Sequence, residues 1–323
     1  MISLAQRRRI TFPDATELRT PLLLPSFSSR VPKIDRIFRT VEDVIDGPVL
    51  ISAYDLRHNY LSEPYDWAPA IFLDSGGYEI SKDTDLSDVS EELTVDGKWP
   101  LDDYIKVLSN WSSIRPLVVV NYDHPQLRCS FAEQIDKALE TKLPSNAIRE
   151  ILLKPETQGQ HFIQIESLLR VVRRLDDFQV VGVTEKEIGN SVFERMRNVA
   201  RLRMTLNDVG IKSPIHVFGS LDTTTTLFYF VAGADIFDGL TWLRYAFREG
   251  RTLYKQDFGI TDVGVMVKAP AVEAVCWSKN YNYLQEMQRQ MRQFLNAYDF
   301  RVFSYHSAQI KSVLESVEES VRP

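Results

Sequence analysis

Short apolar segments recur along most of this chain, and their number constrains the fold more than any other feature. Eight of them, each long enough for one strand, lie near residues 22, 50, 72, 119, 152, 181, 216 and 236. Segments with helical periodicity separate most of them. Uninterrupted apolar strands of this kind are typical of parallel sheets, which are buried on both faces. We therefore predict an α/β protein whose strands run parallel.

Eight β/α units favour a closed barrel over an open sheet. A (β/α)8, or TIM, barrel alternates eight parallel strands with helices over about 250 residues. A doubly wound sheet would be expected to carry a Gly-x-Gly-x-x-Gly turn after its first strand, and the sequence has none there. We predict a TIM barrel over residues 1–260. Residues 261–323 are expected to form a helical extension packed on the barrel, with helices at 280–297 and 306–321 and a strand-like segment at 301–303.

Composition narrows the class of protein. The chain of 323 residues is 44% hydrophobic and 25% charged, as globular proteins in solution are. No apolar run reaches the length of a membrane span. Cys129 and Cys276 are too few for a disulfide framework, so we expect a cytoplasmic protein. The formal net charge of −6 is mild evidence against a nucleic-acid binder, although local basic patches can outweigh the total.

Two of the apolar segments end in a carboxylate. The strand that begins at Ile71 runs into Asp74-Ser75-Gly76-Gly77-Tyr78, and the last strand ends at Asp238. Because the strands of a barrel end at one mouth, residues far apart in the sequence are expected to meet there. The strand-end residues predicted to surround this mouth are Asp74, Asp123, Gln158, Gly182, His216 and Asp238. The acidic segment 81–98 is expected to be an exposed loop or lid.

Two aspartates at one mouth suit chemistry at a sugar carbon. One carboxylate can attack an anomeric centre while the other transfers a proton. Gly76 and Gly77 leave room for a flat group, against which Tyr78 can lie. Taken alone, this stretch is more readily explained as an ordinary strand–turn with a solvated Asp. A triad built on Ser75 lacks the Gly-x-Ser-x-Gly setting, and the sequence shows neither a phosphate-binding Gly-rich loop nor a metal-ligand cluster at the mouth.

These motifs resemble those of the tRNA-guanine transglycosylases, especially their archaeosine-type and DNA-modifying relatives. Asp74-Ser75-Gly76-Gly77-Tyr78 is similar to that family's Asp-Ser-Gly-Gly-aromatic motif. Ala234-Asp235-Ile236-Phe237-Asp238 resembles its Asp-Leu-Phe-Asp nucleophile motif, and His216-Val217-Phe218-Gly219 resembles the His-Leu-Phe-Gly of the archaeal branch. The resemblance extends from about residue 8 to about residue 310.

The resemblance implies a reaction and a role for each matching residue. Asp238 would be the nucleophile that attacks C1′ of a guanosine-type nucleotide, which releases guanine and leaves a covalent glycosyl-enzyme. Asp74 would be the general acid/base that deprotonates the incoming 7-deazaguanine, with 7-cyano-7-deazaguanine the expected base. The residues implied in base binding are Ser75, Gly76, Gly77, Tyr78, Asn121, Asp123, Gln158, Gly182, Val183 and His216. Among them Asp123, with Asn121 as the alternative, would read the guanine edge, and Tyr78 and His216 would lie on the two faces of the base. Flanking phosphates would be held by Arg244, Arg248 and Arg251.

The sequence departs from the family at its zinc site and beside its Gly-Gly motif. The family carries Cys-x-Cys-x-x-Cys and a later His. Here Cys276 and His306 stand at the last two positions, whereas Ala271 and Glu273 replace the first two. Structural zinc sites use four thiolate or imidazole ligands, so we expect no zinc and no other cofactor. Glu79 replaces the family's usual Gln after the aromatic residue.

The expected partners are a polynucleotide and a free 7-deazaguanine base. DNA is favoured over tRNA because the chain is short, the zinc site is degraded and no RNA-binding module of the archaeal kind is present. The target base must leave its stack to enter such a pocket. The alternatives are a tRNA-guanine transglycosylase, a non-catalytic subunit of one, and a barrel hydrolase in which water replaces the incoming base. A homodimer or a helper protein is compatible with the sequence, and no membrane association is expected.

Overall fold

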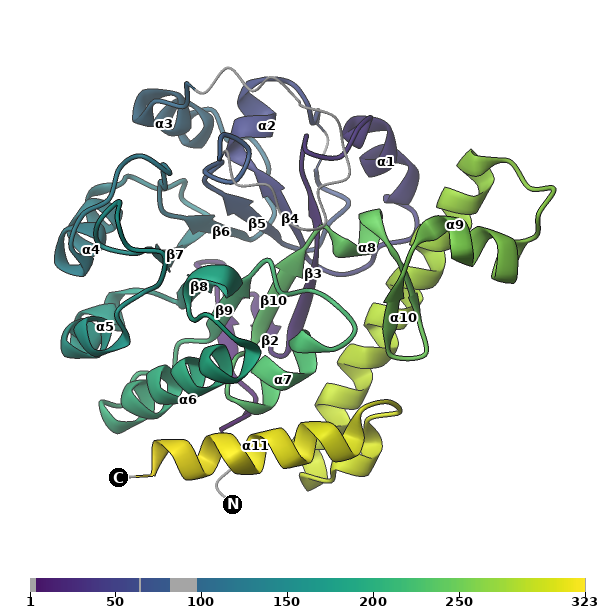
Figure 1. Ribbon diagram of the computed structural model, residues 1–323. Coiled ribbons are helices and arrows are strands. Elements are labelled where there is room, and N and C mark those ends of the chain that lie inside the picture. The colour runs from purple at the N-terminus through teal and green to yellow at the C-terminus, as the bar shows by residue number, and fades with distance from the viewer. Residues whose placement is uncertain (1–3, 64, 82–97, 323) are drawn as a thin grey trace.

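The protein is built around a closed barrel of parallel strands. The computed structural model describes residues 4–63, 65–81 and 98–322. Its barrel strands follow one another in the order β10-β3-β4-β5-β6-β7-β8-β9, so that β10 pairs with β3 and closes the ring (Figure 1). The strands are β3 (Leu22–Phe27), β4 (Val49–Ser52), β5 (Ile71–Asp74), β6 (Leu117–Val120), β7 (Ala147–Leu153), β8 (Val180–Thr184), β9 (Ile215–Phe218) and β10 (Ile236–Gly239). Each lies where a strand was predicted, and the prediction of a TIM barrel is confirmed.

Side chains alternate between the inside and the outside of the barrel, as the two-residue period of a strand requires. Outward-facing residues such as Val181 and Val183 pack in the large apolar cluster beneath the helices. Inward-facing residues form a second, smaller apolar cluster inside the barrel, which includes Leu24, Phe72 and Val120. The strands are therefore buried on both faces, which explains their uninterrupted apolar sequences.

Helices cover the outside of the barrel between consecutive strands. They are α1 (Ile34–Val41), α2 (Ala53–Arg57), α3 (Leu101–Ser109), α4 (Phe131–Glu140), α5 (Ile165–Val171), α6 (Val192–Asp208) and α7 (Thr225–Val231). The start of α4 is set by a capping box, in which Ser130 and Glu133 satisfy each other's backbone N–H groups. The end of α7 is set by Gly233, whose positive φ of 105° suits glycine at this position.

The C-terminal part of the chain is largely helical. After β10 come α8 (Thr241–Arg244), a hairpin of β11 (Ala246–Arg248) and β12 (Arg251–Leu253), α9 (Lys255–Phe258), α10 (Ala269–Ala297) and α11 (Ser307–Val321). Helix α10 starts at Ala269 rather than at residue 280, with a proline in its first turn. It contacts β3, while α11 lies against α6 and α7 (Figure 1). The predicted strand-like segment at 301–303 is wrong, because Phe300–Val302 is a short 3-10 helix.

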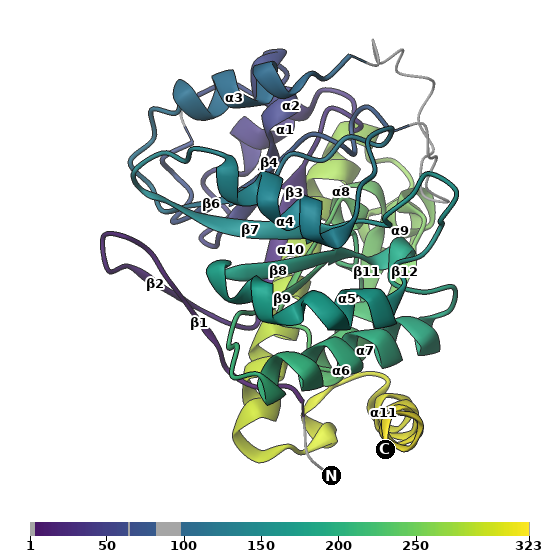
Figure 2. The ribbon, with the colours of Figure 1, turned by 90° about the vertical axis from the view of Figure 1, so that its left-hand side faces the viewer.

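An N-terminal hairpin closes the end of the barrel at which the strands begin. Its strands are β1 (Arg9–Thr11) and β2 (Glu17–Arg19), and Figure 2 shows it extending from that end. Ile10 and Phe12 join the apolar cluster inside the barrel. Beside them, Oδ1 of Asp235 accepts a hydrogen bond from Arg8 at 2.7 Å, and its Oδ2 accepts one from Arg203 at 2.9 Å.

Within the described ranges, no helix combines the length and the apolar character needed to cross a membrane. The predicted acidic lid at 81–98 lies, apart from its two end residues, outside the residues that the structure describes.

We expect Asp235→Ala to destabilise the fold by about 3–5 kcal/mol, because it leaves two buried guanidinium groups without their counter-charge. Arg203 is fully buried and Arg8 is only 6% exposed. The free energy of unfolding measured by urea denaturation of wild type and variant tests this expectation. Asp208→Ala, at the exposed end of α6, is the control and should change stability by less than about 0.5 kcal/mol. A similarly small loss in Asp235→Ala would contradict the structural role given to this cluster.

Candidate active site

The inside of the barrel changes from apolar to polar toward the C-terminal ends of the strands. The inward-facing polar residues, all buried, are Ser26, Ser52, Asp74, Glu150, His216 and Asp238. They come from six different strands. This polar layer lies where the active sites of TIM barrels are built, and it contains both aspartates that the sequence singled out.

Asp238 lies on β10 and is oriented by three hydrogen bonds. Its Oδ1 accepts from the backbone N–H of Gly219 at 3.0 Å and from Nε2 of His216 at 3.2 Å. Its Oδ2 accepts from the hydroxyl of Ser26 at 2.9 Å. That hydroxyl itself accepts from the backbone N–H of Gly239, so its own proton is available for Asp238. The arrangement fixes a carboxylate that is only 6% exposed.

His216 connects Asp238 to a second carboxyl group deeper in the barrel. Its Nδ1 lies 2.7 Å from Oε1 of Glu150, and both side chains are fully buried. Burial opposes a charge on the ring, but the carboxylates of Glu150 and Asp238 raise the pKa of His216 to about 9. Burial also raises the pKa of Glu150. The two shifts compete for one shared proton, and we assign it to the ring because His216 faces a carboxylate on each nitrogen.

The surroundings of His216 leave no room for a base on its ring. Phe218 stacks on it with ring centroids 3.8 Å apart. A Cβ at Gly182 would lie 2.6 Å from the Phe218 ring and 3.2 Å from Oε1 of Glu150. Gly182 therefore provides the space for this packing, and the ring of His216 is fully buried. The stacking of a base on His216, which the resemblance implied, does not fit this burial, whereas the contact implied for the backbone of Gly182 stays a prediction.

Asp74, at the end of β5, belongs to a group of buried carboxyl residues. Oδ2 of Asp74 accepts from the backbone N–H of Gly76 at 3.2 Å. Burial, the charge of Glu79 and smaller contributions that include Asp238 raise the pKa of Asp74 to about 7. Burial likewise raises the pKa values of Glu79 and Asp55 to about 7. The pKa values of three buried acidic side chains near the mouth, Asp55, Asp74 and Glu79, are thus raised toward neutral pH.

Glu79 is held by two serine hydroxyls. Ser28 donates to its Oε1 at 2.6 Å and Ser52 donates to its Oε2 at 2.8 Å. Asp55 accepts from the backbone N–H of Ser29 at 2.8 Å. Hydroxyl donors satisfy a carboxyl group without supplying a positive charge, which is consistent with the raised pKa values.

The turn after Asp74 requires both of its glycines. Gly76 has a positive φ of 98°, and a Cβ there would lie 2.6 Å from Cβ of Tyr54. A Cβ at Gly77 would lie 2.7 Å from Oδ2 of Asp123. The turn therefore brings the segment after β5 against the carboxylate that follows β6. The Ser75 hydroxyl is buried and has no hydrogen-bond partner within the described ranges.

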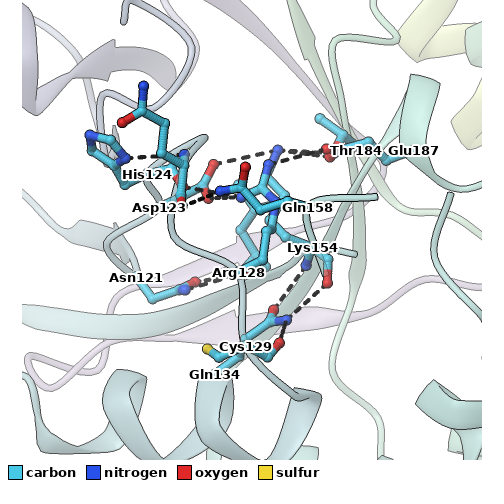
Figure 3. A network of polar contacts seen from close by, with 12 residues as sticks. Asn121, Asp123, His124, Arg128, Cys129, Gln134, Lys154, Gln158, Thr184 and Glu187 are labelled. Carbon is cyan, nitrogen blue, oxygen red and sulfur yellow. Dashed lines mark hydrogen bonds and ion pairs between the residues drawn. The ribbon is translucent and has the colours of Figure 1, made fainter. Parts of the chain in front are cut away.

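Asp123 lies in a network of four charged groups (Figure 3). Arg128 donates to its Oδ1 at 3.0 Å, and Nζ of Lys154 lies 3.5 Å from its Oδ2. Glu187 pairs with Lys154 at 2.8 Å and with Arg128 at 3.6 Å. The network holds Asp123 in place beside a cavity of about 960 Å³, which it lines together with Arg128 and Lys154. Asp74 and Asp238 do not line this cavity.

Three further residues implied in base binding have other contacts. Asn121 connects neighbouring strands, because its Oδ1 accepts from the backbone N–H of Leu152 at 2.5 Å. Gln158 is exposed and donates to the backbone carbonyl of Gln126 (Figure 3). The side chain of Val183 packs in the apolar cluster outside the barrel, and the contact implied for its backbone stays a prediction.

Tyr78 lies at the mouth between two arginines. The guanidinium of Arg30 is 5.0 Å from the centroid of its ring, and Arg244 donates to its hydroxyl at 3.1 Å. Of the other arginines assigned to phosphates, Arg248 pairs with Asp262 at 2.8 Å. Arg251 is exposed and lies opposite Arg248 in the β11–β12 hairpin.

Cys276 and His306, which stand at two of the zinc-ligand positions of the family that the sequence resembles, have separate environments. Sγ of Cys276 is buried among apolar residues that include Phe258, and burial raises the pKa of its thiol to about 11. Nε2 of His306 lies 2.7 Å from the carbonyl of Gly250, to which it must donate. No group of three or more potential ligands is arranged for a metal ion in the part of the chain that the structure describes.

Several residues of the site were not found from the sequence. They are Ser26, Glu150, Ser28, Ser52, Arg128, Lys154 and Glu187. The sequence could have indicated Ser26 and Glu150. Each stands two residues from an inward-facing apolar residue of its own strand and therefore faces the inside of the barrel. The charged network around Asp123 had none, since its members come from separate loops and strands.

We expect the stability of the protein to fall as the three buried carboxyl groups ionise. A carboxyl whose pKa is higher in the folded state than in the unfolded state favours folding at low pH. That contribution is lost as pH rises from about 4 through about 7. Glu79→Gln removes one member of the group. The free energy of unfolding of the variant minus that of wild type should therefore be about 1 kcal/mol larger at pH 6.5 than at pH 5.

Urea denaturation of both proteins at the two pH values measures this difference. The contribution of His216 does not change in that window, because its raised pKa gives a stability that is lost only as pH rises from about 6.5 through about 9. A constant difference between Glu79→Gln and wild type would show that Glu79 does not titrate near neutral pH.

The TIM barrel hosts many unrelated reactions, so the architecture alone does not define an activity. No protein family matches this chain, and no curated protein matches it either. Its function has to be inferred from the residues at the mouth.

Proposed function

We propose that this protein is a transglycosylase that exchanges guanine in a polynucleotide for a 7-deazaguanine base. DNA is the preferred polynucleotide, and 7-cyano-7-deazaguanine is the first candidate base. The observation that carries this proposal is that Asp74 and Asp238 lie in one polar layer but have different surroundings. Asp238 accepts three hydrogen bonds, whereas the pKa of Asp74 is raised to about 7 by burial and neighbouring carboxylates. Two carboxyl groups in such different environments suit a nucleophile and a general acid/base.

In the first half of the proposed reaction, a carboxylate oxygen of Asp238 attacks C1′ of the target nucleotide. The C1′–O bond forms as the C1′–N9 bond breaks, and the bonding pair leaves with guanine. Asp74 in its neutral form gives the departing base a proton. A pKa near 7 leaves a substantial share of Asp74 protonated at neutral pH, which suits this transfer.

In the second half, the ionised Asp74 takes the N9 proton of the incoming 7-deazaguanine. The nitrogen attacks C1′, and the C1′–O bond pair returns to Asp238. Asp74 is then protonated again and Asp238 ionised, so both residues end in their starting forms. The reaction needs no metal or redox cofactor for its atoms and electrons to balance.

The proposed base site lies along the turn after Asp74. Gly76 and Gly77 present backbone without side chains, and Asp123 offers carboxylate oxygens to the amino and N–H groups of a guanine edge. Arg244 is tied to Tyr78 at the mouth, where a phosphate of the flanking strand would approach. A base reaches this layer only after leaving its stack, which favours a single strand or a flipped nucleotide.

The first test is incorporation of radiolabelled guanine into single-stranded DNA, duplex DNA and bulk tRNA. Label retained in DNA supports the proposal, and label in tRNA alone would reassign the substrate to tRNA. Release of guanine without incorporation would identify a hydrolase. Absence of all three reactions would favour a non-catalytic subunit.

We expect Asp238→Asn to lower the rate of guanine exchange at least about a thousandfold, because the variant lacks the attacking carboxylate. It should also form no covalent adduct with a fluorescent oligonucleotide on a denaturing gel. Asp74→Asn should slow exchange by about 10²–10⁴-fold, the usual contribution of a general acid or base. Asp208→Asn, at the exposed end of α6, is the matched control and should exchange at the wild-type rate. Wild-type exchange by Asp238→Asn would disprove the assignment of the nucleophile.

A further inference from the structure

We propose that Glu150 and His216 form a positioning pair that holds Oδ1 of Asp238 and leaves Oδ2 as the oxygen that attacks C1′. The inference rests on the proposed glycosyl transfer at Asp238. It adds to that reaction two buried residues, neither of which touches the substrate, and a choice between two chemically equivalent oxygens.

The two oxygens of Asp238 have different donors. Oδ1 accepts from a backbone N–H and from a ring nitrogen, at 3.0 Å and 3.2 Å. Oδ2 accepts from the Ser26 hydroxyl alone among the described residues. Both donors to Oδ1 are rigid, one in the backbone and one in a ring stacked on Phe218. A hydroxyl can rotate about its C–O bond, so Oδ2 is the oxygen that can exchange its donor for a bond to carbon.

Glu150 determines how His216 can act. A carboxylate oxygen only accepts, so a short contact on each ring nitrogen requires a proton on both. A neutral imidazole has only one such proton. The contact with Glu150 therefore favours the imidazolium form, and a charged donor makes a hydrogen bond about twice as strong as a neutral one.

The pair has a consequence in each half of the reaction. When Oδ2 forms its bond to C1′, Oδ1 becomes the carbonyl oxygen of the glycosyl ester and keeps both donors. When the incoming nitrogen attacks C1′, the C1′–Oδ2 pair returns to Asp238, and negative charge develops on a group that already has two donors in place. Donors arranged in advance where charge develops lower the barrier. The pair thus makes Asp238 a better leaving group in the second half.

Few other charges act on His216. In the described part of the chain, the groups that shift its titration are Glu150 from β7 and Asp238 from β10. Its neighbour on β8 is Gly182, and β5 contributes the apolar ring of Phe72. A change at Glu150 therefore removes one of the two carboxylates that support the charge of His216, and Asp238 is the one that remains.

The experiment compares Glu150→Gln with wild type between pH 6 and pH 8, by exchange of labelled guanine and by formation of the covalent adduct. The substitution keeps the size of the side chain but removes the charge that supports imidazolium. The ratio of the variant's rate to the wild-type rate should fall at least about fivefold from pH 6 to pH 8. In this range His216 loses its proton in Glu150→Gln but keeps it in wild type. Taking the ratio cancels the titration of Asp74. A residue with a merely structural role would give a constant ratio.

A second measurement does not depend on activity. The ring-nitrogen NMR signals of His216 should titrate near pH 9 in wild type and at lower pH in Glu150→Gln. Glu315→Gln, on the exposed face of α11, is the matched control for both measurements and should leave them unchanged. His216→Gln can donate only a neutral hydrogen bond, so it should exchange slowly with a constant ratio to wild type across the range.

The outcomes separate the inference from the proposed function. If wild type exchanges guanine and the ratio for Glu150→Gln stays constant with pH, the positioning pair is wrong and the proposed function stands. If wild type shows neither exchange nor adduct, the proposed function is wrong and the pair's role in it is overturned too. If the ring of His216 then still titrates at a lower pH in Glu150→Gln than in wild type, the electrostatic link between Glu150 and His216 is right and the proposed reaction is wrong.

Discussion

Closure of the barrel through the pairing of β10 with β3 is the constraint on which the site depends. The register places Asp238 opposite Leu24, so that the next inward-facing residue of β3, Ser26, reaches its carboxylate. Because side chains alternate with a period of two, a slip of one residue would turn every inward-facing group of a strand outward. Asp235, which precedes β10, secures this register by joining Arg8 of the N-terminal segment to Arg203 of α6.

Burial of so many acidic side chains in one barrel requires more than one kind of compensation. Among the described residues, no positive group stabilises the charge of Asp74 or Glu79, and both have raised pKa values instead. Asp238 has a buried histidine whose charge is supported by Glu150. Asp123 is paired with Arg128 and Lys154. Carboxyl groups of the same type thus have different partners over a short stretch of the mouth, which suits the separate acid, nucleophile and recognition roles proposed for them.

The elements that were predicted correctly from the sequence are those with a local signal. Apolar runs such as Leu117–Val120 are short and uninterrupted, as buried strands are, and their number favoured the barrel. The positions of Asp74 and Asp238 at strand ends followed from the same runs. The start of α10 was missed because residues 269–279 combine a proline with little apolar periodicity.

Contacts between strands are what the sequence could not supply. The burial of His216 depends on Gly182 of β8 leaving space for Phe218, so its position inside the barrel is a tertiary effect. Glu150 was overlooked because a charged residue interrupts the apolar pattern by which strands are recognised. The link between Arg244 and Tyr78 joins residues from opposite parts of the chain. Local pattern thus predicts which residues stand at the mouth, whereas the packing of neighbouring strands decides which of them act on one another.

The burial of Asp74 and Asp238 bears on the proposed reaction. Asp74 is 8% exposed and Asp238 is 6% exposed, so a nucleotide bound above them would leave little room for bulk water. In the proposed reaction, a glycosyl ester on Asp238 would form at a largely buried carboxylate. In the proposed exchange, an incoming base would take the place of water at C1′. Exclusion of water from an ester of this kind would prevent its hydrolysis, so the burial of these two carboxyl groups supports the proposal of exchange over that of cleavage.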